Sequence, residues 1–254
     1  MNPIHASVIK IEIQSNSYVQ KPYPYELQGL CYHLAGSNYK HEKHLPPKFH
    51  PYLAEWKSNS KFGTKATLKI SSISEELTDG ILRSLELTEV IRIGQKELPL
   101  VGFTVEKQEL VSLEVEHSKP APDEFKINFQ TPTKFRTRAS NSYSTRAYPD
   151  LKLFLRSAAR NLHIQFGLKI SLEEQDQLVE QIRLVNAIAY PVKVKCERKE
   201  PIQDSFIGEV HLDCRNLDMQ QKKLLGLLMK SVKYTGVGHK KGYGLGHIQI
   251  KRPC

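Results

Sequence analysis

The sequence predicts an α+β protein built from two similar halves. Segments in which apolar and polar residues alternate, as in strands, recur along the chain, and segments with helical spacing of apolar residues separate them. The order strand, helix, strand occurs twice. A polar segment with two prolines, residues 117–124, divides the 254 residues between the two repeats. These observations indicate two domains of the same class joined by a short linker.

The first half opens with a strand followed by a helix. Residues 8–13 read Val-Ile-Lys-Ile-Glu-Ile, which alternates as a half-buried strand does. Apolar side chains over residues 23–34 recur at helical spacing, and Gly36 is a good stop signal. A second helix is expected to begin at a capping box formed by Ser72 and Glu75. We predict strands at 8–13, 66–70, 88–93 and 98–115, and helices at 23–34 and 72–85.

The second half repeats this order after the linker. Residues 125–130 alternate as a strand, and a helix begins near Asp150. Ser171 and Glu174 form another capping box. We predict strands at 125–130, 192–197, 206–213 and 246–251, and helices at 149–162, from 171 onward and at 217–230. Each half then has the split βαβ order of the ferredoxin-like fold. The predicted architecture is two tandem ferredoxin-like (βαββαβ) domains, residues 1–116 and 125–254, with a glycine-rich loop before the last strand.

Composition narrows the range of partners. The 37 Lys and Arg residues exceed the 27 Asp and Glu residues, so the net charge is +10 and the pI is about 9.3. Such an excess favours a polyanionic partner, because each neutralised phosphate releases condensed counterions. No run approaches the ~18 consecutive apolar residues of a membrane span, and no signal segment opens the chain. The sequence therefore predicts a cytoplasmic protein that does not associate with a membrane.

No metal and no cofactor are expected. The four cysteines stand far apart without a C-x-x-C pair, so the pattern predicts neither a zinc cluster nor a disulfide framework. The ten histidines show no H-E-x-x-H spacing either. The simplest interpretation of the four cysteines is that they are reduced thiols.

The most unusual segment is residues 234–247, where five of the 14 glycines fall within eleven residues. Glycine lets the backbone approach another chain closely, and neighbouring lysines and histidines add positive charge, so this segment predicts a phosphate-binding loop. The P-loop pattern is absent, and too little chain follows for a dinucleotide-binding unit or an RNA recognition motif. A tight turn or a mobile tail is the alternative that the sequence leaves open. The predicted RNA-binding positions here are Gly236, Gly238, His239, Lys240, Lys241, Gly242, Gly244 and Gly246.

A second basic stretch surrounds the segment Thr131-Pro132-Thr133. Cations that track a backbone, combined with aromatic rings that stack on bases, are typical of RNA-binding surfaces. A solvated strand edge is the alternative, since basic edges discourage aggregation. The predicted RNA-binding residues of this stretch are Lys134, Arg136, Arg138 and Arg146, interleaved with Phe135 and Tyr143.

Taken together, these features resemble the CRISPR-associated precursor-RNA-processing endoribonucleases of the repeat-associated mysterious protein (RAMP) superfamily. The segment Leu27-Gln-Gly-Leu-Cys-Tyr32 is similar to the family's first helix. Residues 129–136 resemble its T-P-T-x-F-R segment, and residues 149–156 resemble the helix that follows. The resemblance implies metal-independent cleavage of CRISPR repeat RNA by attack of the 2′-hydroxyl, leaving a 2′,3′-cyclic phosphate and a 5′-hydroxyl. The partner it implies is CRISPR repeat RNA, processed into guide RNAs.

The resemblance also implies the catalytic residues. In the family a catalytic histidine, often followed by an acidic residue, comes after the first helix, and a lysine follows a few positions later. His41 with Glu42 fits this step and Lys48 fits the lysine, while His44 lies between them and is the alternative. Histidine suits proton transfer because its unperturbed pKa is near 6.5. Tyr32 stands where some relatives carry a tyrosine near the cleaved phosphate, although packing within the helix explains it equally well. Solvated loop histidines without a catalytic role are the remaining interpretation.

Two rival functions stay open at this point. A non-catalytic RAMP-fold RNA-binding subunit of a CRISPR effector complex would share the fold and the glycine-rich segment but lack the histidine after the first helix. An unrelated ferredoxin-like RNA-binding module would leave the T-P-T-x-F-R resemblance unexplained. The three histidines within residues 41–50 favour the enzyme. Association with other CRISPR effector subunits and a homodimer formed through the sheets are both open, because no residue pattern decides them.

Overall fold

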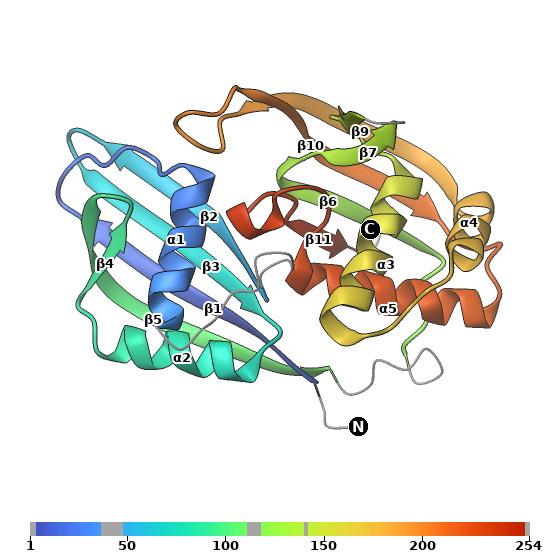
Figure 1. The fold of residues 1–254 in the computed structure, drawn as a ribbon, viewed down its shortest axis with the longest axis horizontal. Helices are drawn as coiled ribbons and strands as arrows, with labels where there is room; N and C mark the ends of the chain where they lie inside the picture. Colours follow the sequence, from blue (N-terminus) through green and yellow to red (C-terminus); the bar gives the residue numbers. More distant parts are fainter. Residues whose placement is uncertain (1–3, 37–47, 111–117, 140–141, 252–254) are drawn as a thin grey trace. The chain divides into compact units, whose positions relative to one another are not determined.

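The structure, a computed structural model, describes residues 4–36, 48–110, 118–139 and 142–251. The chain divides into two units, each of them built from helices and strands (Figure 1). Unit 1 contains residues 1–110 and two short segments from later in the chain, 195–201 and 242–244. Unit 2 contains residues 111–194, 202–241 and 245–254. Among the described residues, no helix has the length and apolar character needed to cross a membrane.

Unit 1 is a five-stranded antiparallel sheet with two helices on one face (Figure 1). The strand order across the sheet is β2-β3-β1-β5-β4. Apolar side chains on alternate positions of the central strands, such as Ile9 and Ile11, pack against the helix residues Leu30 and Ile81 in one buried core. The elements are β1 (Ile4–Ser15), α1 (Pro24–Ala35), β2 (Phe49–Asn59), β3 (Gly63–Ser72), α2 (Glu75–Glu86), β4 (Val90–Ile93) and β5 (Lys96–Leu110).

Unit 2 contains a four-stranded sheet in the order β11-β6-β10-β9, together with the separate hairpin β7-β8. Helices α3 and α5 pack together, and buried side chains such as Phe154 and Leu225 form the core with Phe125, Ile127 and Phe206 of the strands. The elements are β6 (Glu124–Thr133), β7 (Phe135–Ala139), β8 (Ser142–Arg146), α3 (Leu151–Phe166), α4 (Leu172–Gln181), β9 (Arg183–Val194), β10 (Gln203–Asp213), α5 (Met219–Thr235), the 3₁₀ turn η2 (Lys241–Tyr243) and β11 (Ile248–Lys251).

The two main sheets share one topology. The corresponding first, second, third and last strands are β1, β2, β3 and β5 in unit 1 and β6, β9, β10 and β11 in unit 2. In both units the first strand lies between the third and the last, and the second strand lies outside the third. This is the antiparallel arrangement of the ferredoxin-like fold, with the hairpin strand β4 added in unit 1. The predicted pair of ferredoxin-like folds with a glycine-rich loop before the last strand is confirmed.

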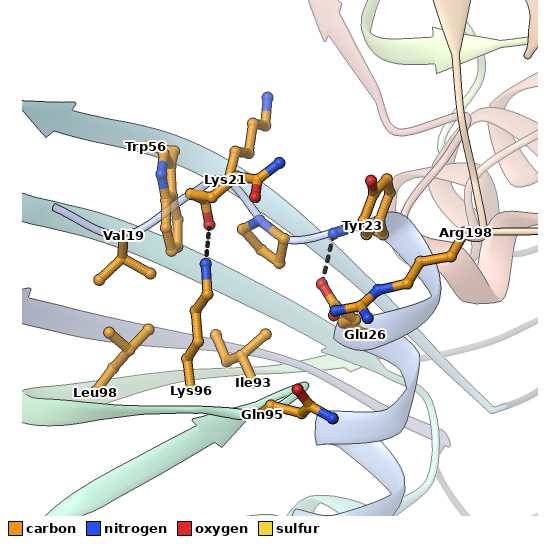
Figure 2. A pocket seen from close by; sticks show the side chains of 12 residues that line it. Val19, Lys21, Tyr23, Glu26, Trp56, Ile93, Gln95, Lys96, Leu98 and Arg198 are labelled. Atoms are coloured by element: carbon orange, nitrogen blue, oxygen red, sulfur yellow. Dashed lines mark hydrogen bonds between the residues drawn. The ribbon is translucent and has the colours of Figure 1, made fainter.

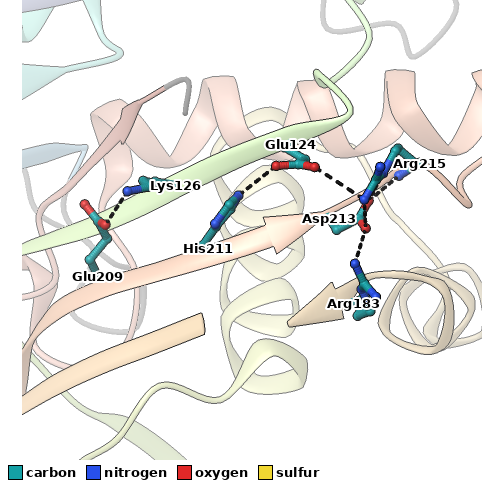
Figure 3. A network of polar contacts seen from close by, with 7 residues as sticks. All are labelled: Glu124, Lys126, Arg183, Glu209, His211, Asp213 and Arg215. Atoms are coloured by element: carbon teal, nitrogen blue, oxygen red, sulfur yellow. Dashed lines mark hydrogen bonds and ion pairs between the residues drawn. The ribbon is translucent and has the colours of Figure 1, made fainter. Parts of the chain in front are cut away.

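Charged side chains form a network of ion pairs at the first residue of β6 and the last residues of β10 (Figure 3). His211 Nε2 lies 3.1 Å from Glu124 Oε2, and Arg215 lies 3.4 Å from the same carboxylate. Asp213 accepts from Arg215 at 2.8 Å and from Arg183 at 3.0 Å. The hydrogen bonds from Arg215 hold the pKa of Asp213 well below its usual range. The Asp213 carboxylate therefore stays charged near neutral pH and links the end of β10 to Arg183 at the start of β9.

Four local predictions differ from the structure. Helix α2 is capped by Ser74, which accepts from the Leu77 N–H, and not by Ser72, because β3 continues through residue 72. Strand β9 begins at residue 183 rather than 192, since its first nine residues are all exposed and show no alternation. Strand β2 was not predicted, because it opens with four consecutive buried residues. The hairpin β7-β8 was also missed.

Replacing Gly226 with alanine in the middle of α5 is expected to destabilise the protein. Helix propensity alone favours alanine by about 0.5–1 kcal/mol. A Cβ at this position would, however, run into the carbonyl oxygen of Lys119, where the chain crosses the helix and the Ala121 N–H donates to the Lys222 carbonyl at 2.7 Å. We expect a net loss of about 1–3 kcal/mol, measured by urea unfolding. A variant more stable than the wild type would contradict this prediction, because it would mean that the backbone at Lys119 can move away from the helix at no loss of stability.

Candidate functional site

The glycine loop, residues 236–246, begins with residues that are hydrogen-bonded to side chains of helix α3. The Asn161 side chain is buried, and its Nδ2 donates to Thr235 Oγ1 at 3.0 Å and to the Gly236 carbonyl at 2.8 Å. One turn earlier on the same helix face, Ser157 Oγ accepts from the Gly238 N–H at 2.9 Å. Helix α3 therefore fixes the path that the chain takes as it leaves α5.

The base of the loop is closed by the segment at the end of β6. The Gly246 N–H donates to the Pro132 carbonyl at 3.1 Å, and the Val237 N–H donates to the Gly246 carbonyl at 2.9 Å. The His239 N–H reaches the Lys134 carbonyl at 2.9 Å. Gly238 lies so close to this carbonyl, at a φ of +82°, that a Cβ would stand 2.5 Å from the oxygen. The T-P-T-x-F-R segment and the glycine loop thus form one hydrogen-bonded structure.

These contacts constrain how the loop can bind a phosphate. The amides of residues 236, 238, 239 and 246 already donate to groups of the protein. Any contact that these positions make with RNA must therefore use something other than those N–H groups. A phosphate bound through the backbone of the loop would instead have to contact residues 240–245.

The predicted cations divide into two sets. Lys134 is buried, with its ammonium on the amide oxygen of Gln203, and the Lys241 ammonium bonds to Asn161 Oδ1. Burial, with a smaller contribution from Arg160, lowers the pKa of Lys241 to about 7. These two lysines support the loop from inside the fold.

The hairpin β7-β8 presents the second set. Arg136 lies exposed on β7, and Arg146 pairs across the hairpin with Phe135. Arg146 donates to Tyr148 Oη at 2.8 Å and to Asp150 Oδ2 at 3.1 Å. The Arg138 and Tyr143 side chains are outside the part that the structure describes. The hairpin therefore offers its cations outward, as a phosphate-binding surface requires.

The tip of the glycine loop, residues 242–244, belongs to unit 1. Gly244 has a φ of +85°, and a Cβ there would run into the carbonyl oxygen of Pro51 on β2. Only glycine allows this approach at this backbone conformation. The tip therefore lies against the first residues of β2.

The start of β2 also contacts the end of α1, so the two elements that flank residues 37–48, the histidine segment, meet in unit 1. Tyr32 near the end of α1 packs edge-on against Phe49 at the start of β2, with ring centroids 5.1 Å apart. Tyr32 Oη also accepts from Gln28 Nε2 at 3.5 Å. Lys48 is exposed, and its carbonyl accepts from the Ile73 N–H at 3.4 Å. The structure thus brings Tyr32 close to the start of β2, next to Lys48.

The two candidate histidines cannot be placed in the same way. His41 and His44 lie in residues 37–47, outside the described residues. The chain enters this segment after Gly36 and leaves it at Lys48, close to the Tyr32–Phe49 contact. Their assignment stays a prediction.

Two further side chains belong to this site. His50 and Tyr52 are buried at the start of β2, with ring centroids 6.0 Å apart. Burial, with a smaller contribution from Glu106, raises the pKa of Tyr52 to about 12. One sequence signal pointed to this place, the third histidine of residues 41–50, but its importance could not be judged because strand β2 was not predicted.

Unit 1 also contains a small pocket of about 80 Å³ (Figure 2). Lys21, Lys96 and Arg198 line it together with Trp56, and Lys96 Nζ donates to the Gln20 carbonyl at 3.4 Å. A water molecule takes up about 30 Å³ in the liquid, so this volume suits a few waters rather than a nucleotide. Within the described ranges, no three His, Cys, Asp or Glu side chains gather as a metal site would require. In the described part of the chain, neither this pocket nor a metal cluster offers an alternative to the loop tip as the candidate site.

Comparison with known families finds a match in the second half of the chain. Residues 127–248 match the sequence model of the family described as CRISPR-associated endoribonuclease Cas6. Over this span the chain is similar to the Cas6 family. The span runs from β6 to the first residue of β11 and contains the whole glycine loop. The resemblance predicted from the sequence is confirmed.

Solved Cas6 structures share the whole fold. A Cas6 product complex is 18% identical with a TM-score of 0.74 and is matched over 97% of this chain and 99% of its own. Thermus thermophilus Cas6 is 17% identical with a TM-score of 0.71, over 98% of this chain and 99% of that one. The protein of a Cas6-related gene from Pyrococcus furiosus is 16% identical with a TM-score of 0.62, over 98% of each chain. At these identities the similarity establishes the fold. No curated protein sequence matches the chain.

Lys241 is expected to make stability depend on pH. Its pKa is about 7 in the folded chain against the ordinary 10.5, so between these values the unfolded state binds one more proton. The free energy of unfolding should therefore rise with pH over this window in the wild type, relative to Lys241→Met. Urea unfolding of both proteins at pH 6.5, 8 and 9.5 measures the difference. A difference that is constant with pH would mean that the ammonium is well solvated.

Proposed function

We propose that this chain cleaves CRISPR repeat RNA within the precursor transcript to make guide RNAs. Two matching Cas6 structures are described as a product complex and a substrate mimic complex, which supports RNA as the ligand of this fold. The observation that carries the proposal is the position of the loop tip. Gly244 meets the carbonyl of Pro51, three residues after Lys48, where the histidine segment ends. A phosphate at the tip would lie beside the start of β2, which directly follows Lys48.

The proposed reaction is attack of a ribose 2′-hydroxyl on the adjacent phosphate. It leaves a 2′,3′-cyclic phosphate and a 5′-hydroxyl, so the protein must supply a base, an acid and positive charge. We assign proton transfer to His41, with His44 as the alternative, since imidazole exchanges protons near neutral pH. Lys48 is exposed at the end of the same segment and would stabilise the charge on the phosphorane. Tyr32 would orient the phosphate through its hydroxyl.

RNA binding is proposed to be shared between two surfaces. The hairpin β7-β8 carries Arg136, Arg138 and Arg146, and the glycine loop carries Lys240 at its tip. Guanidinium groups pair well with phosphate oxygens, and a glycine-rich backbone allows a close approach. These positions would hold the RNA backbone while the histidine segment acts on one linkage.

A non-catalytic RNA-binding subunit is the second candidate. One matching structure, 13% identical with a TM-score of 0.62, is described as a RAMP protein that binds different RNA substrates. A fold does not by itself imply catalysis, so RNA binding alone is compatible with this architecture. The presence of His41, His44 and Lys48 after the first helix favours the enzyme.

Cleavage is expected to persist in EDTA and to leave a 2′,3′-cyclic phosphate. The reaction proposed here uses side chains and the substrate's own hydroxyl and needs no metal-bound water. Purified protein is incubated with radiolabelled repeat RNA in EDTA, and mass spectrometry identifies the product ends. A free 3′-hydroxyl, or a strict requirement for Mg²⁺, would contradict the mechanism. Binding without any cleavage would favour the non-catalytic subunit.

His41→Ala is expected to slow single-turnover cleavage by about 10²-fold or more, the usual range for loss of a general acid or base. RNA affinity should change little, because a neutral imidazole contributes little to phosphate binding. His44→Ala should have a smaller effect, and Lys48→Ala should slow the chemical step. His163→Ala removes an exposed histidine of α3 and serves as the control. Full activity of the His41→Ala, His44→Ala double variant would exclude histidine catalysis by this segment.

A further inference from the structure

The connection between β9 and β10 is held in unit 1 by a backbone contact. Residues 195–201 belong to unit 1, and within them Cys196 is fully buried. Its carbonyl accepts from the Tyr25 N–H at 3.3 Å, in the first turn of α1. The Glu200 N–H donates back to the Glu197 carbonyl at 3.3 Å and closes a turn. Glu197 is therefore carried on a short segment that is attached to the helix start.

The Glu197 carboxylate binds the tip of the glycine loop. Tyr243 Oη donates to Glu197 Oε1 at 2.7 Å. Burial, together with this hydrogen bond, raises the pKa of Tyr243 well above its usual range, so the phenol remains a donor at all working pH values. This contact is thus suited to holding the tip in one position.

The residue after Tyr243 is the one that meets β2. Gly244 lies against the Pro51 carbonyl at a φ of +85°, a backbone conformation available to few residues. Because the two residues are adjacent, a hydrogen bond that fixes Tyr243 also limits where Gly244 can lie.

We propose that Glu197 is a positioning residue for RNA cleavage, which acts through Tyr243 to hold the loop tip against the start of β2. The inference rests on the proposed function, since it assigns a role in the same site. Neither residue touches the reacting atoms in this proposal. Positioning errors of about 1 Å can cost about 10²-fold in rate, so loss of the contact should appear in the chemical step.

Single-turnover cleavage of repeat RNA by four variants tests the proposal. Glu197→Ala and Tyr243→Phe should each slow cleavage by about tenfold or more, with little change in the Kd for RNA. The double variant should be no slower than the slower single variant, because both changes remove the same contact. Glu197→Gln keeps an oxygen acceptor for the phenol and should recover most of the rate. Glu76→Ala and Tyr18→Phe, which alter exposed side chains of unit 1, are the matched controls.

A second measurement does not depend on catalysis. Hydrogen–deuterium exchange of peptides covering residues 242–246 should become faster in Glu197→Ala and Tyr243→Phe, while the thermal midpoint stays close to that of the wild type. Unchanged exchange, or rate losses that add in the double variant, would overturn the positioning role. A slow Glu197→Ala beside a normal Tyr243→Phe would overturn it as well. If the wild type leaves repeat RNA intact, the proposed function fails, and the exchange experiment still decides whether Glu197 holds the tip.

Discussion

The glycine loop depends on one buried amide, the side chain of Asn161. Its two ends serve different parts of the loop, because Nδ2 holds Thr235 and Gly236 while Oδ1 receives the Lys241 ammonium. Each such bond contributes about 0.5–1.5 kcal/mol net, but a partner left unsatisfied in the interior costs about 1–3 kcal/mol. The helix that carries Asn161 therefore sets the conformation in which the loop can form.

This arrangement changes how the positive charge of the loop should be understood. A glycine-rich segment with adjacent lysines suggests a row of cations pointing at phosphates. In the folded chain Lys241 bonds to Asn161, and Lys134 beneath the loop bonds to Gln203. Burial of an ammonium is costly, which is why the pKa of Lys241 falls to about 7. Part of the charge thus supports the backbone geometry, and the exposed arginines of the hairpin β7-β8 are the cations proposed to contact RNA.

The repeated fold could be predicted because its pattern is local. Alternation in β1 and β6 and the capping box of Ser171 with Glu174 indicate their elements directly, and the structure has them there. Prediction failed where burial does not alternate. Strand β9 is exposed on both faces over nine residues, and β2 opens with four buried ones, so neither shows the period of two. Missing strand β2 had the larger effect on the predicted site, because His50 and Tyr52 lie on this strand.

By itself the sequence determined the class of protein and the residues on which its chemistry is proposed to depend. Net charge, glycine spacing and the T-P-T-x-F-R segment are properties of residue types and short distances along the chain, and they predicted the resemblance that the Cas6 family match supports. Only the tertiary structure decided that Pro132 and Gly246 share a hydrogen bond, that Gly244 meets Pro51, and that Glu197 binds Tyr243. These pairs are 46 to 193 positions apart, counting from the residue numbers. Contacts over such separations arise from how the sheets and helices pack, which no local pattern of residues encodes.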